Sequence, residues 1–294
     1  LSLENNQEIG IFLMVYSNLD IFIQHRNYLL EGNEITLSWK EIQSRIRSGN
    51  LNWVRVGDWK SIQLTTGETV IMEVAGINTY CGYSASGTTA SLTNTIDFIS
   101  RDCLSTLYQM NSTNTNEGAY LGSELRPKLI PGGAIYNTLP SDLKPYIGVK
   151  RRWYGKMSNG TASSAGAWTS EEGLWIPSVV EVFGRNSFND SGYDCEDAKQ
   201  YPIFIGSERH IIKGQGNGGN AVNWWLCSPR SGFTTNFCNV SNSGNAGNNN
   251  ASGALGVVLG FRTYFIFLNN SFFYFFSFGD KGNRKEKVTI INCN

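Results

Sequence analysis

Charged residues are scarce in this sequence, at 16% of the 294 residues, whereas soluble domains usually contain about 25%. Basic and acidic residues balance, with 24 Lys and Arg against 24 Asp and Glu. A nucleic-acid-binding protein normally has a basic excess or a basic stripe, and the runs Lys150-Arg151-Arg152 and Lys281–Lys287 are too short to provide one. We interpret both runs as solvated faces, so the composition argues against a nucleic-acid partner.

Histidine is almost absent, with two residues, His25 and His210. A Ser–His–Asp triad or a Cys–His pair needs a histidine as its base. His25 lies in an N-terminal segment without clear periodicity, which leaves His210 as the only serious candidate, and its setting Arg209–Ile212 is more typical of a structural histidine. Transition-metal sites lack ligands for the same reason. We therefore predict no catalytic residue, no metal and no cofactor.

The six cysteines form no C-x-x-C pair. This excludes a zinc ribbon and argues against a dense disulfide framework. Their positions are Cys81, Cys103, Cys195, Cys227, Cys238 and Cys293. A bond between Cys227 and Cys238 remains open, but we favour two buried thiols.

Neither end of the sequence carries a recognisable targeting or membrane segment. Glu4 and Glu8, and no basic region, precede the apolar patch Ile11–Val15, so we identify no signal peptide, and export stays open. The aromatic run Thr263–Phe278 is shorter than the roughly 20 residues of a membrane helix and is interrupted by Asn269-Asn270. We interpret it as an unpacked appendage or as translated AT-rich non-coding sequence, in preference to a membrane anchor.

Three motifs suggest chemistry but lack its usual context. Gly214-x-Gly216-x-x-Gly219 matches a dinucleotide fingerprint, yet Asn220–Trp225 is a poor helix start and no acidic residue follows about 20 residues later, so we predict a flexible loop. Glu171 and Glu172 are adjacent in sequence and should point apart, which disfavours an acid–base pair.

The third motif is an acidic cluster that offers oxygen ligands of the kind that Ca²⁺ prefers. Its members are Asp190, Asp194, Glu196 and Asp197. Their spacing fits no EF-hand, and we interpret the cluster as a solvated loop, with calcium binding left open.

The sequence predicts an α+β protein that begins with a small module over residues 36–100, after an extension over residues 1–35. Ser38 and Glu41 form a capping box for a helix over Ser38–Ser48, which Gly49 ends. Strands are expected over three segments that follow, namely Trp53–Val56, Ser61–Leu64 and Thr69–Ile77, with a turn at Gly67.

A larger domain is expected over residues 101–262, followed by the tail over residues 263–294. We predict a short helix over Asp97–Tyr108, a helix over Ser123–Leu129 that Pro127 and Pro131-Gly132-Gly133 break early, and a buried strand over Leu174–Phe183. Gly206–Asn220 reads as a loop. A final β region is expected to begin at Trp224-Trp225 and to close at Gly256–Arg262.

The most informative segment is Ser231–Leu255, which is rich in Asn, Ser and Gly and has core-like sequence on both sides. Phe237, Cys238 and Val240 predict a strand, Asn242-Ser243-Gly244 a hairpin turn, and a second strand should run from Asn245 into Val257-Val258. Small polar side chains on a fixed β framework give adaptable hydrogen bonding at little entropic cost, as in binding surfaces. The alternative is an inert low-complexity loop.

Several motifs together resemble one family, and each is weak alone. They are Met110–Asn116, Ser123–Arg126, Leu139–Lys144, Trp175 with Glu181–Gly184, Trp224-Trp225-Leu226-x-Ser228-Pro229 and Gly260-Phe261-Arg262. Over residues 36–262 the sequence resembles bacterial and phage proteins with a C-type-lectin fold, related to formylglycine-generating enzymes, several of which are variable proteins of diversity-generating retroelements. It departs from them at Cys227, where the family usually has Arg, and at Pro127 and Pro131-Gly132-Gly133.

The resemblance implies that Ser231–Leu255 is hypervariable. In such proteins a reverse transcriptase rewrites adenines, so that AAC codons for Asn become NNC codons, which cannot encode Lys, Glu, Gln, Met or Trp. None of these five occurs in Ser231–Leu255. The implied contact residues are Phe233, Thr234, Thr235, Asn236, Asn239, Ser241, Asn242, Ser243, Asn245, Gly247, Asn248, Asn249, Asn250, Ser252, Gly253 and Leu255. The implied scaffold residues are Trp224, Trp225, Phe237, Val240, Phe261 and Arg262.

The resulting hypothesis is a non-enzymatic receptor or adhesion protein at a cell surface, secreted or on a virion, whose ligand is a protein or glycan on another cell or particle. Two alternatives remain: an oxidase-like enzyme, which would require reactive Cys227 and Cys238 in a cleft, and an inert structural surface or virion protein.

Overall fold

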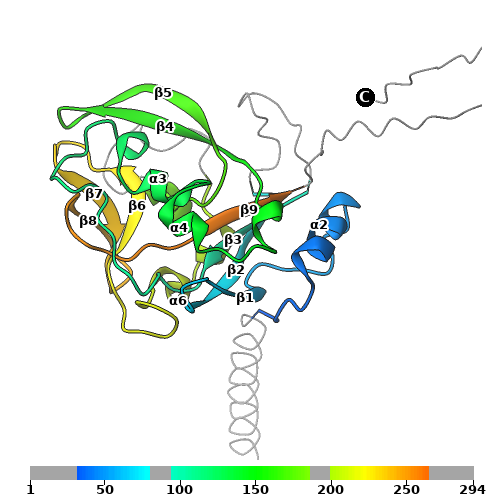
Figure 1. The fold of residues 1–294 in the computed structure, drawn as a ribbon. Coiled ribbons are helices and arrows are strands. Elements are labelled where there is room, and N and C mark those ends of the chain that lie inside the picture. Colours follow the sequence, from blue (N-terminus) through cyan, green and yellow to red (C-terminus); the bar gives the residue numbers. More distant parts are fainter. Residues whose placement is uncertain (1–31, 80–93, 186–198, 265–294) are drawn as a thin grey trace, which may run out of the picture.

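The computed structural model describes residues 32–79, 94–185 and 199–264. Within them the protein is α+β, with antiparallel sheets and short helices, as the sequence predicts (Figure 1). The helices, with 3-10 turns marked η, are α2 (Trp39–Arg47), η1 (Tyr120–Gly122), α3 (Arg126–Leu129), α4 (Ala134–Asn137), η2 (Lys144–Tyr146), α5 (Val179–Phe183), η3 (Pro202–Phe204) and α6 (Glu208–Ile211). In the described part of the chain, no helix is both long and apolar enough to cross a membrane.

The strands form three antiparallel sheets. The first has the order β1 (Trp59–Gln63), β2 (Thr69–Ile77), β3 (Thr95–Ser100), β9 (Gly260–Tyr264). The second pairs β4 (Lys150–Ser158) with β5 (Thr161–Glu171), and the third has the order β6 (Trp224–Pro229), β7 (Asn236–Val240), β8 (Ala246–Asn250). Strand β3 lies in the small module expected over residues 36–100, and β9 begins in the larger domain expected after it. Because these two strands pair, the boundary expected at residue 100 separates strands of a single sheet.

Helix α2 confirms the predicted helix and its capping box. The Ser38 side chain accepts from the Glu41 backbone N–H, and the Glu41 carboxylate accepts from the Ser38 backbone N–H. The buried face of the helix packs on the first sheet, where the Trp39 ring lies 5.5 Å from that of Phe98 and 5.6 Å from that of Phe261. Amphipathic spacing and a cap at the right position are local signals, so the sequence was sufficient here.

The strand expected at Thr69–Ile77 is confirmed at both ends, and β1 overlaps the strand expected at Ser61–Leu64. The strand expected at Trp53–Val56 is wrong, because these residues form turns in which the Trp53 indole N–H donates to the Asn50 carbonyl. Neighbouring apolar residues indicate burial, but they do not establish that a partner strand lies beside them.

The helix expected at Asp97–Tyr108 is wrong. Residues Thr95–Ser100 form β3, whose six residues are all buried, and the chain beyond Ser100 is irregular apart from isolated bridges at Cys103 and Tyr108. A strand buried on both faces has no alternation of polar and apolar residues, so its sequence resembles a short buried helix.

The strand expected at Leu174–Phe183 is also wrong beyond its first residues. Trp175 pairs with Gly260 in an isolated bridge, and the chain then forms α5, which has a capping box of Ser178 and Glu181 and ends at Gly184 with φ 70°. The S-x-x-E spacing was a helix signal in the sequence that the apolar Val and Ile content concealed.

Two other segments differ from expectation in detail. Helix α3 is short and ends at Leu129, just before Pro131-Gly132-Gly133, as expected, whereas Pro127 lies in its first turn, where proline is tolerated, and does not break it. The segment Gly206–Asn220 is mostly irregular and contains the four-residue α6.

Candidate functional site

The hairpin Ser231–Leu255 contributes β7 and β8 to a three-stranded sheet that β6 completes. Strand β7 lies between β6 and β8 and is buried on both faces. Phe237 packs with Trp225 in one hydrophobic cluster, whereas Val240 packs with Trp224 in a second one. The central strand therefore anchors the hairpin to two clusters at once.

The expected scaffold residues are all fully buried. Trp224, Trp225, Phe237, Val240, Phe261 and Arg262 each have 0% exposure. Both tryptophans also use their indole N–H groups, since Trp224 donates to the Ile211 carbonyl at 2.9 Å and Trp225 to the Tyr108 carbonyl at 2.8 Å. Buried indole N–H groups usually require such a partner, and here the two hydrogen bonds fix the orientation of the tryptophan rings on β6.

The turn between β7 and β8 is well defined. The Gly244 N–H donates to the Ser241 carbonyl at 2.9 Å, the Ser241 N–H donates to the Asn245 carbonyl at 2.7 Å, and Gly244 has φ +83°. This is a type I turn followed by a left-handed residue, a common three-residue hairpin connection. The predicted turn at Asn242-Ser243-Gly244 is confirmed, but the second strand ends at Asn250 and does not continue to Val258.

Asn116 organises the start of the hairpin, a role that the sequence did not reveal. It is 1% exposed, and its side-chain amide donates to three carbonyls, those of Phe233 at 2.6 Å, Asn236 at 3.0 Å and Arg230 at 3.2 Å. Its backbone N–H donates to the Thr234 carbonyl at 2.9 Å. One buried side chain thus sets the path of the loop that leads into β7.

The same polar run contacts the end of the hairpin. The Asn111 N–H donates to the Ala251 carbonyl at 3.0 Å, and the Asn114 side-chain oxygen accepts from the N–H and hydroxyl of Ser252. The Gln109 amide donates to the Ser252 carbonyl at 2.6 Å. Repeated Asn next to Ser and Thr, as in this run, is typical of side chains that bind loop backbones, a signal that predicts such a role without identifying its partners.

Most of the expected contact residues are exposed or half-buried, but two are not. Asn239 is 2% exposed and Leu255 is 8% exposed. These two are corrections to the predicted contact set: Asn239 lies on the central strand, and Leu255 pairs with Tyr108 in the core. Gly247 is also constrained, because a Cβ atom there would lie 2.5 Å from the Asn239 side-chain oxygen.

The threefold spacing of the Asn residues does not produce one Asn-covered face. Side chains alternate faces along a strand with period two, so Asn236 and Asn239 point to opposite sides of the sheet. Asn236 instead meets Asn248 across the hairpin, with its amide donating to the Asn248 side-chain oxygen at 2.7 Å. Asn242 lies in the turn. The structure therefore divides the repeat among two faces and a loop.

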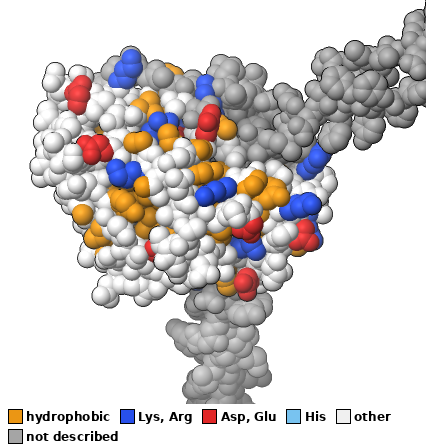
Figure 2. Space-filling view, in the orientation of Figure 1, with side chains coloured by type: hydrophobic (Ala, Val, Ile, Leu, Met, Phe, Trp, Pro, Cys, Tyr) orange, Lys and Arg blue, Asp and Glu red, His pale blue; other side chains and the backbone are white. Residues whose placement is uncertain are grey.

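The hairpin surface, meaning the exposed side chains of Ser231–Leu255, carries no charged residue. White, uncharged polar side chains and backbone make up most of the molecular face in Figure 2. The one large apolar side chain exposed on the hairpin surface is Phe233, at 45%, and the Arg230 guanidinium lies 5.3 Å from its ring centroid. A neutral surface with one aromatic residue favours hydrogen-bonding ligands over strongly charged ones.

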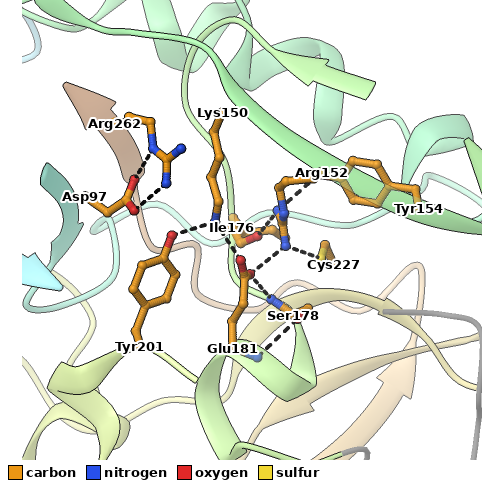
Figure 3. A network of polar contacts seen from close by, with 10 residues as sticks. All are labelled: Asp97, Lys150, Arg152, Tyr154, Ile176, Ser178, Glu181, Tyr201, Cys227 and Arg262. Atoms are coloured by element: carbon orange, nitrogen blue, oxygen red, sulfur yellow. Dashed lines mark hydrogen bonds and ion pairs between the residues drawn. The ribbon is translucent and has the colours of Figure 1, made fainter. Parts of the chain in front are cut away.

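A buried ionic network links β4 to α5, and a second buried ion pair beside it links β9 to β3 (Figure 3). The Glu181 carboxylate accepts from Lys150 Nζ at 2.6 Å and from Arg152 Nη2 at 2.6 Å. Arg262 pairs with Asp97 through two contacts, at 2.9 and 2.8 Å, with both side chains 0% exposed. Glu181 thus links α5 to β4, Arg152 extends the network to Cys227 of β6, and the Arg262–Asp97 pair joins β9 to β3 beside it.

The solvated face expected at Lys150–Arg152 is wrong for its two ends. Lys150 is 0% exposed and Arg152 is 4% exposed, because the strand alternation of β4 turns both side chains inward toward Glu181. Lys150 Nζ also donates to the Tyr201 hydroxyl at 2.6 Å and lies 3.8 Å from the centroid of the Trp175 ring.

Burial and pairing shift the pKa values of this network in opposite ways. Burial opposes ionisation of Glu181, but the charges of Arg152 and Lys150 outweigh it and lower the pKa of Glu181 to about 2. Burial lowers the pKa of Lys150 to about 8, although the Glu181 charge acts in the opposite direction. The network is therefore held mainly by the ionised carboxylate.

The cysteines that an oxidase-like reaction would need are inside the protein. Cys227 and Cys238 are buried thiols, at 3% and 1% exposure, so the expectation of buried thiols is confirmed. Arg152 Nη2 donates to Cys227 Sγ at 3.1 Å, which places Cys227 within the ionic network. Cys103 is a third buried thiol, and burial raises the pKa of its thiol to about 12.

The other motifs form structural contacts where the structure describes them. Gly214–Gly219 is a loop without a following helix, and Asp102 accepts from the N–H groups of Gly214 and Gly218. His210 Nδ1 lies 3.2 Å from the buried carboxylate of Glu73. Glu171 is buried and contacts Arg126, whereas the adjacent Glu172 is exposed.

No group of three or more potential metal ligands occurs within residues 32–79, 94–185 and 199–264. The acidic cluster at residues 190–197, the basic run Lys281–Lys287 and most of the aromatic tail lie outside the described residues, as do residues 1–31.

Comparison with known proteins gives one match. A family model described as a domain of unknown function, DUF6273, matches residues 94–265, which is more than half of the chain. No curated protein and no solved structure matches the sequence. The matched region includes the hairpin, the residues around Asn116 and the buried ionic network.

Proposed function

The chain belongs to the DUF6273 family, a domain of unknown function, and from this premise we propose that it is a ligand-binding protein of C-type-lectin-like fold that recognises its ligand through the hairpin surface. The observation that carries the proposal is the contrast between the two sides of one hairpin. Phe237 and Val240 are fully buried, whereas Asn242, Asn245 and Asn248 are exposed on the same hairpin.

This contrast supports binding better than an inert loop. A low-complexity loop has no need for buried anchors, whereas the backbone of this hairpin is bound at its start by Asn116 and at its end by Asn111 and Asn114. Side chains on such a framework are presented in fixed positions, so binding loses little conformational entropy. Apart from Phe233, the exposed side chains are small and uncharged, and they change at little cost to the fold.

Kinship with the variable proteins of diversity-generating retroelements is part of the same proposal. Replacement of exposed Asn by other residues alters the chemistry of the surface without touching its anchors. We propose a protein or glycan on another cell or particle as the ligand, since the uncharged surface offers hydrogen bonds and Phe233 but no charge for a nucleic acid. A near-repeat of the codons for Trp224–Arg262 that differs at adenines, beside a reverse-transcriptase gene, would support this part.

An enzyme of oxidase type is the second candidate, and the positions of its cysteines disfavour it. Cys227 and Cys238 are almost completely buried, and no substrate reaches a thiol at 1–3% exposure without rearrangement of the core. Alkylation of the folded protein that abolished a measurable oxidase activity would decide in favour of the enzyme.

The direct test exchanges the exposed hairpin residues for those of another family member while retaining Phe237, Cys238, Asn239, Val240 and Leu255. We expect ligand preference on glycan and peptide arrays to follow the exchanged residues. The melting temperature should stay within a few degrees of the parent, because exposed substitutions each change stability by about 0.5 kcal/mol or less.

The matched control changes exposed residues of β1, Ser61 and Gln63, to Ala, and it should leave array binding unchanged. If the exchanged protein kept the ligand preference of the parent, the result would contradict the proposal. Unfolding of the exchanged protein would contradict it as well.

A further inference from the structure

Backbone hydrogen bonds define which residues of β8 direct their N–H and C=O groups toward β7 and which direct them toward the outer edge of the strand. Two contacts establish it: the Ser241 N–H donates to the Asn245 carbonyl, and the Ala251 N–H donates to the Thr235 carbonyl. With the continuous register between β7 and β8, Asn249 and Gly247 are then the β8 residues that exchange backbone hydrogen bonds with β7. The alternate residues Ala246, Asn248 and Asn250 direct their N–H and C=O groups away from β7.

Contacts within the hairpin satisfy one end of this edge. The Asn250 N–H donates to the Asn249 side-chain oxygen at 2.8 Å, and the Asn250 carbonyl accepts from Gly253 at 2.8 Å. The next outward N–H, that of Ser252, donates to Asn114. Among the described residues no strand pairs with β8 other than β7, so the backbone groups of Ala246 and Asn248 have no strand partner on the outer side.

This outer edge is hydrogen-bonded at both ends and, within the described part of the chain, no other strand covers it. Its two ends are fixed by the Ser241–Asn245 turn and by the contacts of Ala251 with Thr235 and Asn111. Proteins usually protect edge strands with lysine, proline or a bulge, yet β8 reads Ala-Gly-Asn-Asn-Asn and has an uninterrupted register with β7. Asn248 and Asn250 are exposed beside the edge and carry no charge that would repel a second strand.

We propose that the β8 edge binds an extended polypeptide segment of a partner protein, which adds to the sheet as a fourth strand next to β8. The chemistry of the edge favours a polypeptide over a glycan, because alternating N–H and C=O groups at strand spacing match an extended peptide backbone. The inference rests on the proposed binding function and selects the ligand class within it.

Strand addition also explains how a diversified surface retains affinity. Backbone groups of Ala246 and Asn248 are unchanged by any substitution except proline, so they provide a constant contribution to binding. The exposed side chains on either side of the edge provide the selectivity. Variation then changes which peptide is bound while the mode of binding is preserved.

The test uses linear peptides selected from a displayed random library on the full-length protein. Asn248→Pro removes the outward N–H and places the proline ring where the added strand would lie, but the β7 ladder does not use this N–H. Asn248→Ala is the matched control, because it loses the same side chain and the same contact with Asn236 and retains the N–H.

We expect Asn248→Pro to bind the selected peptides roughly tenfold or more weakly than Asn248→Ala, because the two variants lose the same side chain and only the proline also loses the N–H and adds a steric clash. N-methylation of the peptides provides a measurement that is independent of the folding of the variants. Methylation of a backbone nitrogen should abolish binding at alternate positions along the peptide, because only every second residue of an added strand directs its N–H toward β8.

Equal loss in the Pro and Ala variants, no periodicity on N-methylation, or no enriched peptide would each overturn strand addition. Glycan binding that depends on the exchanged hairpin residues and ignores Asn248→Pro would overturn it while leaving the proposed function intact. Dimerisation of the free protein that Asn248→Pro abolishes would assign the edge to a second copy of the chain and would also reject the inference. Absence of any hairpin-dependent ligand would reject the proposed function itself.

Discussion

Substitution of Glu181 by Gln lowers the stability of the folded protein by roughly 3–5 kcal/mol, because it leaves two buried cations without their shared carboxylate. Lys150 and Arg152 each contact one Glu181 oxygen at 2.6 Å, and both are almost completely buried. Thermal unfolding followed by circular dichroism should show a melting temperature lower by roughly 10 °C, at 2–4 °C per kcal/mol for a domain of this size.

Two variants show whether the loss comes from uncompensated charge. Glu172→Gln, at the exposed neighbour of Glu171, should change stability by about 0.5 kcal/mol or less. Lys150→Met in the Glu181→Gln background removes one of the unpaired cations and should recover part of the loss. A Glu181→Gln variant as stable as Glu172→Gln would contradict the account of the network.

The same carboxylate gives a pH signature with a definite sign. The pKa of Glu181 is lowered in the folded state to about 2 from an ordinary value of 4.5, so the folded state favours the ionised form. Its contribution is complete above pH 4.5 and is lost as the pH falls from 4.5 to about 2. Denaturant unfolding measured across this window should show a shallower loss of stability in Glu181→Gln than in the parent.

Substitution of Asn116 by Ala lowers stability by roughly 2–3 kcal/mol and loosens the hairpin. The Asn116 amide contacts three carbonyls, and the substitution leaves all three without this donor. Hydrogen exchange should accelerate in peptides that cover residues 230–236, where those carbonyls lie. The rate of hydrogen exchange should remain unchanged in α2, because Asn116 does not connect this helix to the loop. Ligand binding should weaken in parallel, because the loop carries Phe233.

Asn114→Ala is the appropriate comparison, because Asn114 is exposed and contacts the hairpin only at Ser252. Its effect on stability should be about 0.5 kcal/mol or less. If Asn116→Ala were no more disruptive than Asn114→Ala, the hairpin would owe its conformation to β6 and β7 alone.

The sequence predicted those elements whose signals lie within a few neighbouring residues. The capping box of Ser38 and Glu41 and the helix that follows, the strand Thr69–Ile77, and the turn at Asn242-Ser243-Gly244 are all present as expected. It failed at β3 and α5, where buried apolar residues read equally well as helix or strand. In both, the outcome depends on partners distant in sequence, namely β9 beside β3 and the basic pair of β4 beside Glu181.

For the candidate site, the sequence identified the segment and the structure selected the residues within it. Asn239 and Asn242 are equivalent in the threefold repeat, yet one is 2% exposed on a central strand and the other lies in an exposed turn. The run of Asn, Ser and Thr around Asn116 indicates loop binding, but nothing nearby in the sequence identifies its partners, because its three acceptors lie more than a hundred residues away.

The sequence by itself determined the α+β character, the scarcity of charge and the hairpin with its turn, because composition, alternation and turn chemistry act over short stretches of chain. Only the tertiary structure decided that Lys150 and Arg152 are buried beside Glu181 and that Asn116 supports the hairpin. It also decided that β8 has no second strand partner among the described residues, since the pairing of strands and charges depends on contacts between residues that the chain brings together only when it folds.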